Sequence, residues 1–382
     1  MMSEYKMPRG IVISGTGLWT PPDVISNEEL VHALNTFAEK YNRENAAAIE
    51  AGELAAKPFS SAEFIEKASG IKSRYVISKE GILDPERMRP YLPERADDEL
   101  CLQAEMGLNA ARRALEKANK KPEDIDAVIV GASYLQRAYP AIAIEIQGAL
   151  GIDGFAFDME VACSSATFAL QRAVDAISSG SAKAVLVINP ELASPQVDYT
   201  DRDSHFIFGD VAVATVVERK ESCSADTAWE ILGTKAKTVF SNNIRSNVSY
   251  TSRAADVDPF GEGKLFRQNG RKVFKEVCPM AAAHLENQVQ ELGFEPNAID
   301  RWWLHQANIN MNHLIAKKLM GDDTTPERAP VVLDRFANTG CAGSVIAFNL
   351  HSDDLEVGSR GVICSFGAGY SIGSLALEKV AV

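Results

Sequence analysis

The sequence predicts an α/β protein built from two similar halves in tandem. Apolar runs of strand length alternate with segments whose apolar residues recur at helical spacing. A helix, a Pro-x-x-Ile-Asp turn and an apolar strand follow one another at residues 97–133, and the same order returns at residues 274–307. Unbroken apolar strands are typical of parallel strands that are covered on both faces. A duplicated α/β unit accounts for both observations.

Three further short patterns recur in the same order in both parts of the chain. We therefore divide it into an N-terminal half, 1–220, and a C-terminal half, 221–382. An insertion at about residues 35–57 and a proline-rich loop at 85–93 account for most of the extra length of the first half. The paired patterns are Gly-Ser at 180 and 358, Phe-Gly at 208 and 366, and Ile-x-Gly-Thr at 13 and 231.

Local signals place the first elements of the chain. Residues 9–17 form a short apolar run that ends in glycines, which predicts a buried strand, and Ser26 opens the helix that follows. Residues from about 35 to 57 are rich in Ala, Glu and Asn but only weakly apolar, so we expect a helical surface element. Ser60 and Glu63 have the spacing of a capping box for the next short helix.

Composition excludes several classes of function. The 382 residues carry a formal charge of −13, which argues against a general binder of nucleic acid or of anionic membranes. The six cysteines are scattered without a Cys-x-x-Cys pair, so we expect neither a zinc site nor a disulfide framework, and no metal. The N-terminus has no signal-peptide pattern, and no apolar run approaches the roughly 20 residues of a membrane span. We therefore expect a cytoplasmic protein.

The stretch from Phe155 to Gly180 changes from a strand pattern to a helical pattern at Cys163. The thiol is thus expected at a helix N-terminus, where the dipole and free N–H groups favour a thiolate and suit an oxyanion. Position alone leaves two interpretations open, a nucleophile or a buried core thiol. In the duplicated arrangement, the counterpart helix that begins near residues 338–341 meets this helix head-on at the centre of the protein.

Two polar residues and one glycine-rich segment follow in the second half. His305 ends an apolar strand, as a general base or hydrogen-bond donor would in an α/β fold, although a structural histidine is equally compatible with the pattern. Asn338 lies in a turn of small residues, where asparagine is also a common cap or turn former. The segment SFGAGYSIG, 365–373, suits a backbone that approaches a substrate closely and offers an N–H group.

These motifs together resemble a known family. VACSSATFAL around Cys163, LHQAN around His305, DRFANTG around Asn338 and the terminal SFGAGYSIGS occur in the order of the condensing enzymes of the thiolase superfamily. The sequence is most similar to 3-oxoacyl-[acyl-carrier-protein] synthase III, as a divergent branch with an N-terminal insertion. The resemblance implies a thiolase-like fold, in which two pseudo-duplicated halves form a five-layer αβαβα sandwich.

The resemblance also implies a two-stage Claisen condensation without a cofactor. Cys163 would take an acyl group from a CoA or carrier-protein thioester, and malonyl-carrier protein would then lose CO2 and attack the acyl-enzyme. His305 and Asn338 would hold the malonyl thioester oxygen, while the backbone N–H groups of Cys163 and Ala368 would form the oxyanion hole. The product would be a 3-oxoacyl-carrier protein for fatty acid or related biosynthesis, formed from CoA and phosphopantetheine thioesters.

Six further positions are matched to substrate-binding residues of the family. Tyr139 corresponds to an aromatic residue that reaches into the acyl pocket of a partner subunit, so a homodimer is implied. Phe208 would line the acyl channel, and Arg202 would lie near the CoA entrance. Lys275 corresponds to a basic residue where the phosphopantetheine arm and the acyl carrier protein approach. The other two positions, Phe64 and Asn310, depart from the pattern.

The departures concern the expected CoA contacts. Phe64 replaces the tryptophan that stacks on adenine in well-known members, Ala68 replaces a basic residue, and Asn310 replaces the arginine after HQAN. With the insertion, they suggest an acyl donor that is longer than acetyl or that arrives on a carrier.

Other functions remain as alternatives. A thiolase would use a second cysteine, but Cys364 lies one residue too far from Gly367 for that role, and Cys341 is interpreted as a small core thiol. A non-catalytic acyl-binding homologue would not need the Cys, His and Asn set. A related acyltransferase or quinolone-type synthase would share the acyl-enzyme and differ in the acceptor.

Overall fold

The computed structural model describes residues 10–254, 256, 258, 261 and 263–382, so Arg9, the first residue of the predicted first strand, lies outside the described residues. Its strands are β1 (Ile11–Trp19), β2 (Asp23–Ser26), β3 (Ser73–Val76), β4 (Ala127–Gly131), β5 (Phe155–Met159), β6 (Ala184–Glu191), β7 (Val211–Arg219), β8 (Thr227–Thr238), β9 (Ile244–Arg245), β10 (Arg267–Gln268), β11 (Arg301–Leu304), β12 (Arg360–Gly367) and β13 (Ser371–Ala381). Its helices are α1 (Asn27–Glu44), α2 (Ala46–Glu50), α3 (Ala62–Ser69), α4 (Glu80–Leu83), α5 (Leu102–Lys117), α6 (Ile142–Leu150), α7 (Ser165–Ser178), α8 (Gly270–Glu291), α9 (Ile309–Met320), α10 (Leu333–Phe336) and α11 (Gly343–Leu350).

The main sheet repeats one topology on both sides of a central seam. Its order is β11-β12-β13-β8-β1-β7-β6-β4-β5, and β1 meets β8 only at Val12 and Ile13. On one side, β4 and β6 are parallel, and β6, β7 and β1 continue antiparallel. On the other side, β11 and β12 are parallel, and β12, β13 and β8 continue antiparallel. The proposed division at residue 220 falls between β7 and β8, and its position stays a prediction.

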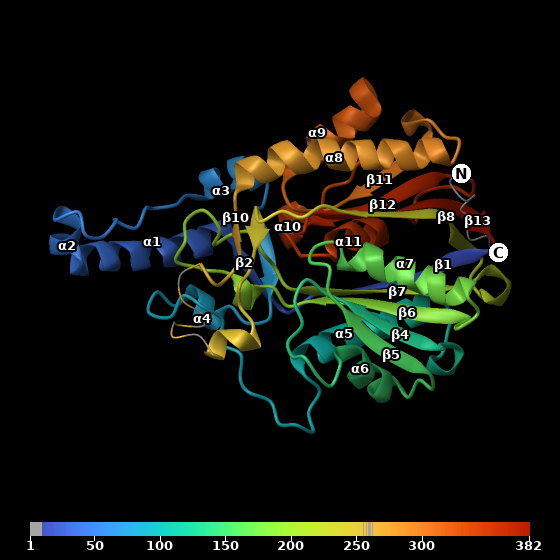
Figure 1. Ribbon diagram of the computed structural model, residues 1–382, viewed down its shortest axis with the longest axis horizontal. Helices are drawn as coiled ribbons and strands as arrows, with labels where there is room; N and C mark the ends of the chain where they lie inside the picture. The colour runs from blue at the N-terminus through green and yellow to red at the C-terminus, as the bar shows by residue number, and fades with distance from the viewer. Residues whose placement is uncertain (1–9, 255, 257, 259–260, 262) are drawn as a thin grey trace.

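The helices and the two parts of the sheet form five layers (Figure 1). α5 packs on β1, β6 and β7, and α6 packs on β4 and β5, which makes one outer layer. α7 contacts β4, β6 and β7 on one side and β12 and β13 on the other, and α11 contacts β1, β11 and β12. α8 covers β12 and β13, with α9 beside it. The αβαβα arrangement expected from the sequence is therefore confirmed.

Small residues let α7 fit between the two parts of the sheet. Its fully buried face contains Ala166, Ala169, Leu170, Ala173 and Ile177, which recur at helical spacing. These side chains belong to a core cluster that extends from the strands of the first half to those of the second. The position of α7, and with it the orientation of its N-terminus, is therefore set from both sides.

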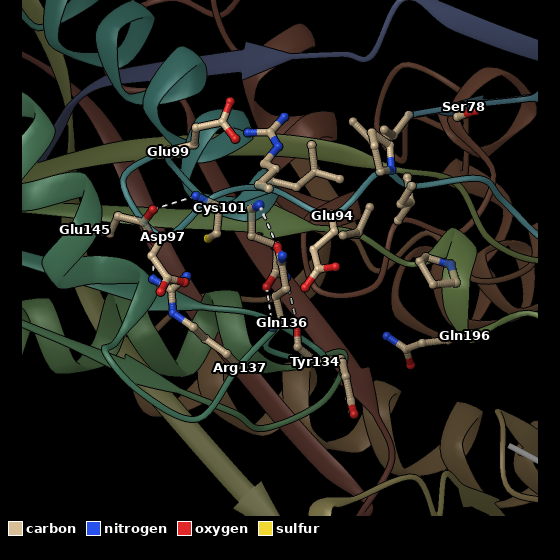
Figure 2. A pocket seen from close by; sticks show the side chains of 18 of the residues that line it. Ser78, Glu94, Asp97, Glu99, Cys101, Tyr134, Gln136, Arg137, Glu145 and Gln196 are labelled. Carbon is tan, nitrogen blue, oxygen red and sulfur yellow. Dashed lines mark hydrogen bonds and ion pairs between the residues drawn. The ribbon is translucent and has the colours of Figure 1, made fainter. Parts of the chain in front are cut away.

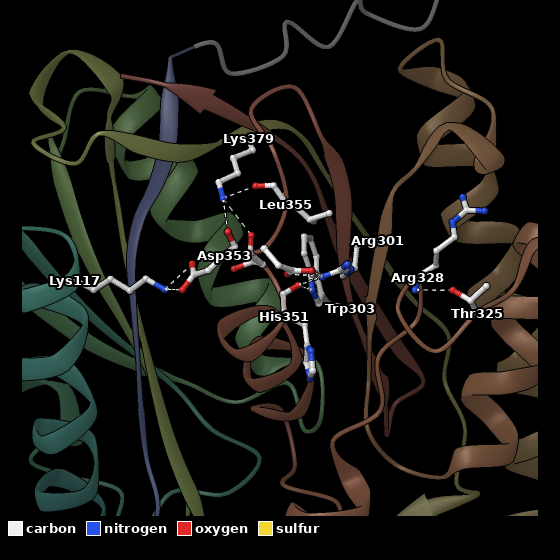
Figure 3. Close-up of polar contacts among 11 residues, drawn as sticks. Lys117, Arg301, Trp303, Thr325, Arg328, His351, Asp353, Leu355 and Lys379 are labelled. Atoms are coloured by element: carbon white, nitrogen blue, oxygen red, sulfur yellow. Dashed lines mark hydrogen bonds and ion pairs between the residues drawn. The ribbon is translucent and has the colours of Figure 1, made fainter.

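Residues of β11 anchor the C-terminal end of α11 (Figure 3). The indole Nε1 of Trp303 and Nη1 of Arg301 each donate to the carbonyl oxygen of His351, both at 2.9 Å. The Trp303 ring also packs edge-on against Phe348 of α11, with centroids 4.9 Å apart, and against Trp229 of β8, 5.3 Å apart. With this end fixed, the opposite end of α11 points toward Cys163.

The insertion is an arm formed by α1, α2 and an extended return segment, and it projects from the body (Figure 1). It begins inside α1, which starts at the predicted cap Ser26 with a complete capping box. Asn42 ties the return segment to α1, since its Nδ2 donates to the carbonyl oxygen of Lys57 at 2.9 Å and its Oδ1 accepts from the Lys57 N–H at 2.7 Å. A surface element was expected here, and the arm has that character.

The predicted capping box of α3 was wrong by one residue. The cap is Ser61, whose hydroxyl accepts from the N–H of Phe64. Ser60 is instead held by the arm, because its N–H donates to Oδ1 of Asn35 and its carbonyl oxygen accepts from Nδ2 of the same side chain.

Two expected absences concern only the described part of the chain. None of its helices is long and apolar enough to cross a membrane. Its histidine, cysteine, aspartate and glutamate side chains form no cluster of three or more that could hold a metal ion. The six cysteines are free thiols.

Candidate active site

Cys163 lies between β5 and α7, two residues before the first residue of the helix. The preceding residue, Ala162, has a left-handed backbone with φ of 45°, which costs energy for a residue other than glycine. This turn sends the chain from the strand into the helix within a few residues. The result is a half-buried residue, whose thiol is the buried part, at the centre of the protein.

The glycine-rich turn after β12 packs directly on Cys163. A Cβ atom at Gly367 would lie 2.5 Å from the Cys163 Cβ and 3.1 Å from its Sγ, so only glycine fits without displacing the loop that carries Cys163. The next N–H group, that of Ala368, is close enough to lower the pKa of the Cys163 thiol by hydrogen bonding. The structure thus brings together the two amides, of Cys163 and Ala368, that the resemblance assigns to an oxyanion hole.

The protonation state of Cys163 differs from the expectation. Burial, together with the charge of Glu191, raises the pKa of the thiol to about 12, against smaller lowering effects from Ala368, Ser133 and its own N–H. The resting side chain is therefore a thiol at neutral pH. The helix position alone suggested a thiolate because the sequence did not reveal a carboxylate beside the sulfur.

His305 follows the last residue of β11 and is 2% exposed. Its ring packs edge-on against Phe366 with centroids 5.0 Å apart, and its Nδ1 atom has no hydrogen-bond partner in the described part of the chain. Burial lowers the pKa of His305 to about 4. The imidazole is therefore neutral at physiological pH, as a hydrogen-bond donor to a developing enolate must be if it is not to give up its proton.

Asn338 joins the second half to the first. Its N–H donates to the carbonyl oxygen of Ile207 at 2.9 Å, and its own carbonyl oxygen accepts from the N–H of Gly209 at 3.1 Å. The side-chain Oδ1 accepts from the N–H of Gly340 at 3.1 Å. Since the amide oxygen is held in this way, the NH2 group is the part of the side chain that remains to donate to a substrate oxygen.

Sequence reasoning missed two residues that adjoin the thiol, Glu191 and Ser133. Glu191, the last residue of β6, is 1% exposed, and its Oε1 accepts from the Ser133 hydroxyl at 2.8 Å and from the Ser133 N–H at 2.9 Å. The signal was an acidic residue at the carboxyl end of an unbroken apolar strand, the usual place for functional groups in α/β folds.

Cys341 is the counterpart of Cys163 in the repeat and is fully buried, as expected for a core thiol. Its N–H donates to Oε1 of Glu191 at 2.7 Å, and its Sγ donates to the carbonyl oxygen of Gly131 at 3.3 Å. It also borders Cys163, because the two thiols interact electrostatically. The starts of the two central helices therefore converge, and Glu191 lies between them. Cys364 is buried within β12.

The three departures from the family pattern lie at one place, between α3 and α9. The Arg202 guanidinium stacks on the Phe64 ring at 3.7 Å from its centroid, and its Nε donates to the carbonyl oxygen of Phe59 at 2.8 Å. Asn308, the cap of α9, donates from Nδ2 to the carbonyl oxygen of Ala68 at 2.7 Å, which places Asn310 beside α3. Their role in CoA binding stays a prediction.

A cavity of about 1210 Å³ opens beside the loop after β4 (Figure 2). Tyr139, which is 85% exposed, lines it together with apolar residues that include Leu192 and Leu265. The ion pair between Arg137 and Glu145 lies along the polar part of its wall. Neither Cys163, His305 nor Asn338 is among its lining residues.

Two residues that line the cavity lie next in the chain to residues that adjoin the thiol. The lining residues Tyr134 and Leu192 directly follow Ser133 and Glu191 in the chain, and those two residues adjoin Cys163.

The remaining two matched positions are Phe208, which lies in the core, and Lys275, which lies on the surface. Phe208 is 8% exposed, packs edge-on against Phe266 at 4.7 Å, and forms a backbone bridge with Asn338. Lys275 is exposed on α8. Their proposed contacts with an acyl chain and with a carrier protein remain predictions.

Comparison with known proteins decides the family. The family model for 3-oxoacyl-[acyl-carrier-protein] synthase III matches residues 157–238, and the model for its C-terminal region matches residues 289–379. The chain is 53% identical over 349 residues to a β-ketodecanoyl-[acyl-carrier-protein] synthase of Pseudomonas aeruginosa, covering 91% of this chain and 100% of that protein. The chain belongs to the 3-oxoacyl-[acyl-carrier-protein] synthase III family. It is therefore a condensing acyltransferase.

Further members agree over nearly the whole length. A β-ketoacyl-[acyl-carrier-protein] synthase III of Granulibacter bethesdensis is 30% identical over 372 residues, covering 96% of this chain and 98% of that protein. The crystal structure of the 3-oxoacyl-[acyl-carrier-protein] synthase III of Aquifex aeolicus superposes with a TM-score of 0.74 at 25% identity, covering 97% and 100% of the two chains. The thiolase-like fold expected from the sequence is thereby confirmed.

The pH behaviour of His305 provides a test of the site geometry that needs no substrate. We expect 15N spectra of histidine-labelled protein to show a neutral imidazole from about pH 8 to about pH 5.5, since burial holds the pKa at about 4. Because unfolding returns the ring to its ordinary pKa, His305 also lowers folding stability as the pH falls from 6.5 toward about 4. His305→Gln assigns the signal, and a His305 resonance that titrates near 6.5 contradicts the buried geometry.

Proposed function

We propose that the protein condenses an acyl thioester with malonyl-carrier protein to give 3-oxoacyl-carrier protein, CO2 and the free donor thiol. The observation that supports it best is the position of Cys163, beside the Ala368 N–H and between the two converging central helices. His305 and Asn338 supply neutral donors on the second half. A binding module would not need this combination.

In the first stage, the Cys163 sulfur attacks the thioester carbonyl carbon of the donor. Negative charge develops on the carbonyl oxygen, and the N–H groups of Cys163 and Ala368 stabilise it. Because Gly367 packs rigidly on Cys163, these donors need no rearrangement during the reaction. The donor thiol leaves, and the acyl group stays on the sulfur.

In the second stage, His305 and Asn338 bind the thioester oxygen of malonyl-carrier protein. Loss of CO2 leaves an enolate, and both side chains donate to its oxygen more strongly as the charge grows. A neutral imidazole suits this role, since the enolate then gains a donor without being protonated. The enolate carbon attacks the acyl-enzyme carbonyl and releases the product and the Cys163 sulfur.

We further propose a medium-chain donor of eight carbons. The relative with 53% identity is named for a ten-carbon product, and decarboxylating condensation with malonate adds two carbons. The cavity of about 1210 Å³, which Leu192 and Leu265 help to line, offers space for such a chain. The replacement of the adenine-stacking tryptophan by Phe64, which Arg202 covers, is compatible with recognition through the acyl chain.

Acyl-enzyme formation tests both proposals. Incubation with a series of acyl-CoA and acyl-carrier donors from two to twelve carbons is expected to add the largest mass at Cys163 with the eight-carbon acyl group. Malonyl-carrier protein should then remove this mass and yield the 3-oxoacyl product, and Cys163→Ala should form no adduct. Acylation by acetyl donors alone contradicts the chain length. An acyl-enzyme that malonyl-carrier protein does not discharge would favour the quinolone-type alternative.

A homodimer is proposed from the exposed edge of the main sheet. β5 is the last strand and pairs only with β4. Its Phe155 and Phe157 are 40% and 38% exposed, and an exposed apolar edge strand is a template for pairing with a second chain. Pairing of two β5 strands would also bring the exposed Tyr139 of each chain to the partner. The site is proposed to work in the cytoplasm.

Phe157→Asp tests the dimer. Two carboxylates at the apolar pairing surface should convert the protein from dimer to monomer in sedimentation equilibrium at micromolar concentration, because unpaired charges are costly there. Val357→Asp is the matched control, since Val357 is 55% exposed in the loop before β12, toward the opposite end of the sheet order. A wild-type monomer, or a dimeric Phe157→Asp variant, contradicts pairing through β5.

Docking of the acyl carrier protein is proposed at the start of α8. Five exposed basic residues lie on β9, β10 and the first turns of α8, on a chain whose net charge is −13. A local positive field suits an anionic partner, including the phosphate of a phosphopantetheine arm. These residues are Arg245, Arg267, Arg271, Lys272 and Lys275.

Lys275→Glu tests the carrier surface. We expect KM for malonyl-carrier protein to rise about tenfold, with a smaller effect at high salt, while Cys163 acylation by acyl-CoA is unchanged. Lys183→Glu is the control, because Lys183 is exposed just before β6, at the end of that strand opposite Glu191. Equal effects of both substitutions would argue for a general field and against a docking site.

A further inference from the structure

The first stage of the reaction needs an acceptor for the thiol proton. At neutral pH Cys163 is protonated in the resting site, because burial and the charge of Glu191 raise its pKa. An attack on a thioester by the neutral thiol is unfavourable, since the thiolate is the nucleophile. A group close to the sulfur must therefore remove the proton as the bond to carbon forms.

His305 is poorly suited to this task. It is buried in a position where its pKa falls to about 4, so protonation of the ring is unfavourable at neutral pH. Its neutral form is also the one that the enolate needs in the second stage. The acceptor is better sought among the other groups around the sulfur.

Glu191 has the geometry of a held proton acceptor. Its Oε1 accepts three hydrogen bonds, from the Ser133 hydroxyl at 2.8 Å, the Ser133 N–H at 2.9 Å and the Cys341 N–H at 2.7 Å. Glycine is required at 340, because a Cβ there would lie 2.6 Å from both the Glu191 Cδ and the Ser133 Oγ. The carboxylate and the hydroxyl are thus fixed in one orientation.

Ser133 adjoins both the carboxylate and the thiol. Its single hydroxyl proton is donated to Glu191, so its lone pairs are free to accept. Its hydroxyl is also near enough to Cys163 to influence the thiol directly. The Ser133 oxygen is therefore placed to take a proton from Cys163 while its own O–H proton passes to Glu191.

We propose that Glu191 accepts the proton of Cys163 through the Ser133 hydroxyl during acyl transfer and returns it to the leaving thiolate. The S–H bond of Cys163 breaks as its sulfur bonds to the acyl carbon. Ser133 takes that proton and passes its own to Oε1 of Glu191. When the bond between carbon and the donor sulfur breaks, the proton moves back through Ser133 to the donor thiolate, and Glu191 is again a carboxylate.

The other groups around Glu191 do not provide this route. The titratable side chains that face it are the two thiols, of Cys163 and Cys341. Cys341 donates its S–H to the carbonyl oxygen of Gly131, and the charge of Glu191 helps to raise its pKa, so it stays a thiol. Burial raises the pKa of Glu191 above its ordinary value, while the hydrogen bonds from Cys341 and Ser133 oppose the rise, and a raised pKa makes the carboxylate a better proton acceptor.

Glu191 has a second possible role, as a purely structural link between the loop after β4 and the turn before α11. The two roles predict different outcomes for Glu191→Gln. A glutamine oxygen still accepts the same three hydrogen bonds, so a structural link would survive. An amide does not accept a proton, so the relay would be lost.

Alkylation of Cys163 by iodoacetamide tests the relay in the absence of substrate. The inference rests on the proposed nucleophile Cys163, but this assay can fail or succeed independently of the condensation itself. We expect the rate for the full-length wild-type protein, read by mass spectrometry at Cys163, to rise in two steps with pH. The first step lies at the raised pKa of Glu191, above which the carboxylate is able to take the proton, and the second lies toward pH 12, where the thiolate forms directly.

Glu191→Gln and Ser133→Ala should each lose the first step and react about 100-fold more slowly at pH 7.5, the usual contribution of a positioned base. Ser133→Ala keeps the carboxylate and both backbone hydrogen bonds, so it decides the question if Glu191→Gln does not fold. Cys341→Ala is the matched control, because it alters a neighbour of Cys163 outside the relay and should keep both steps. The relay is overturned if a folded Glu191→Gln or Ser133→Ala variant retains the first step, or if Cys341→Ala loses it.

Discussion

The active site depends on the contact between the two halves of the chain at Asn338. Its backbone pairs on both sides with residues 207 to 209 of the first half, so the turn before α11 is held in register with the half that carries Cys163. A second link between the halves is formed by Glu191 of the first half, which accepts a hydrogen bond from the Cys341 N–H of the second. Two buried links of this kind fix position and orientation together, which is what a preorganised site requires.

Close packing at two glycines holds the backbone against Cys163 and Glu191. At 367 and 340 a side chain would collide with Cys163 and with Glu191 respectively, so glycine lets the backbone come within contact distance of the reacting groups. The buried face of α7 and the anchored end of α11 hold the two helices from behind. The cost is an electrostatic one, because the same burial that orders the site keeps Cys163 protonated and His305 neutral. In the proposed reaction, a group beside Cys163 must therefore take the thiol proton in the first stage. In the second stage, the neutral His305 serves as a hydrogen-bond donor to the enolate.

The arm contacts the pair formed by Arg202 and Phe64, and this contact was not evident from the sequence. Composition alone indicated the insertion and its surface position. Its return segment reaches Arg202 through the Phe59 carbonyl oxygen, and Arg202 in turn covers Phe64. The one-residue error at the cap of α3 has the same origin, since Ser60 is held by Asn35 from α1. Local patterns do not contain such contacts between distant segments.

By itself the sequence determined the duplicated α/β order, the αβαβα layers, the family and the set of Cys163, His305 and Asn338 as candidates. The duplicated order follows from hydrophobic periodicity and repeated patterns, while the layers, the family and the three candidates follow from the resemblance of short motifs to a known family; all of these are local properties of the chain. Only the tertiary structure decided that Cys163 is a thiol and that Ser133 and Glu191 adjoin it. A pKa depends on burial and on charges brought close by folding, and β4, β6 and α7 meet at that point only when the sheet has formed.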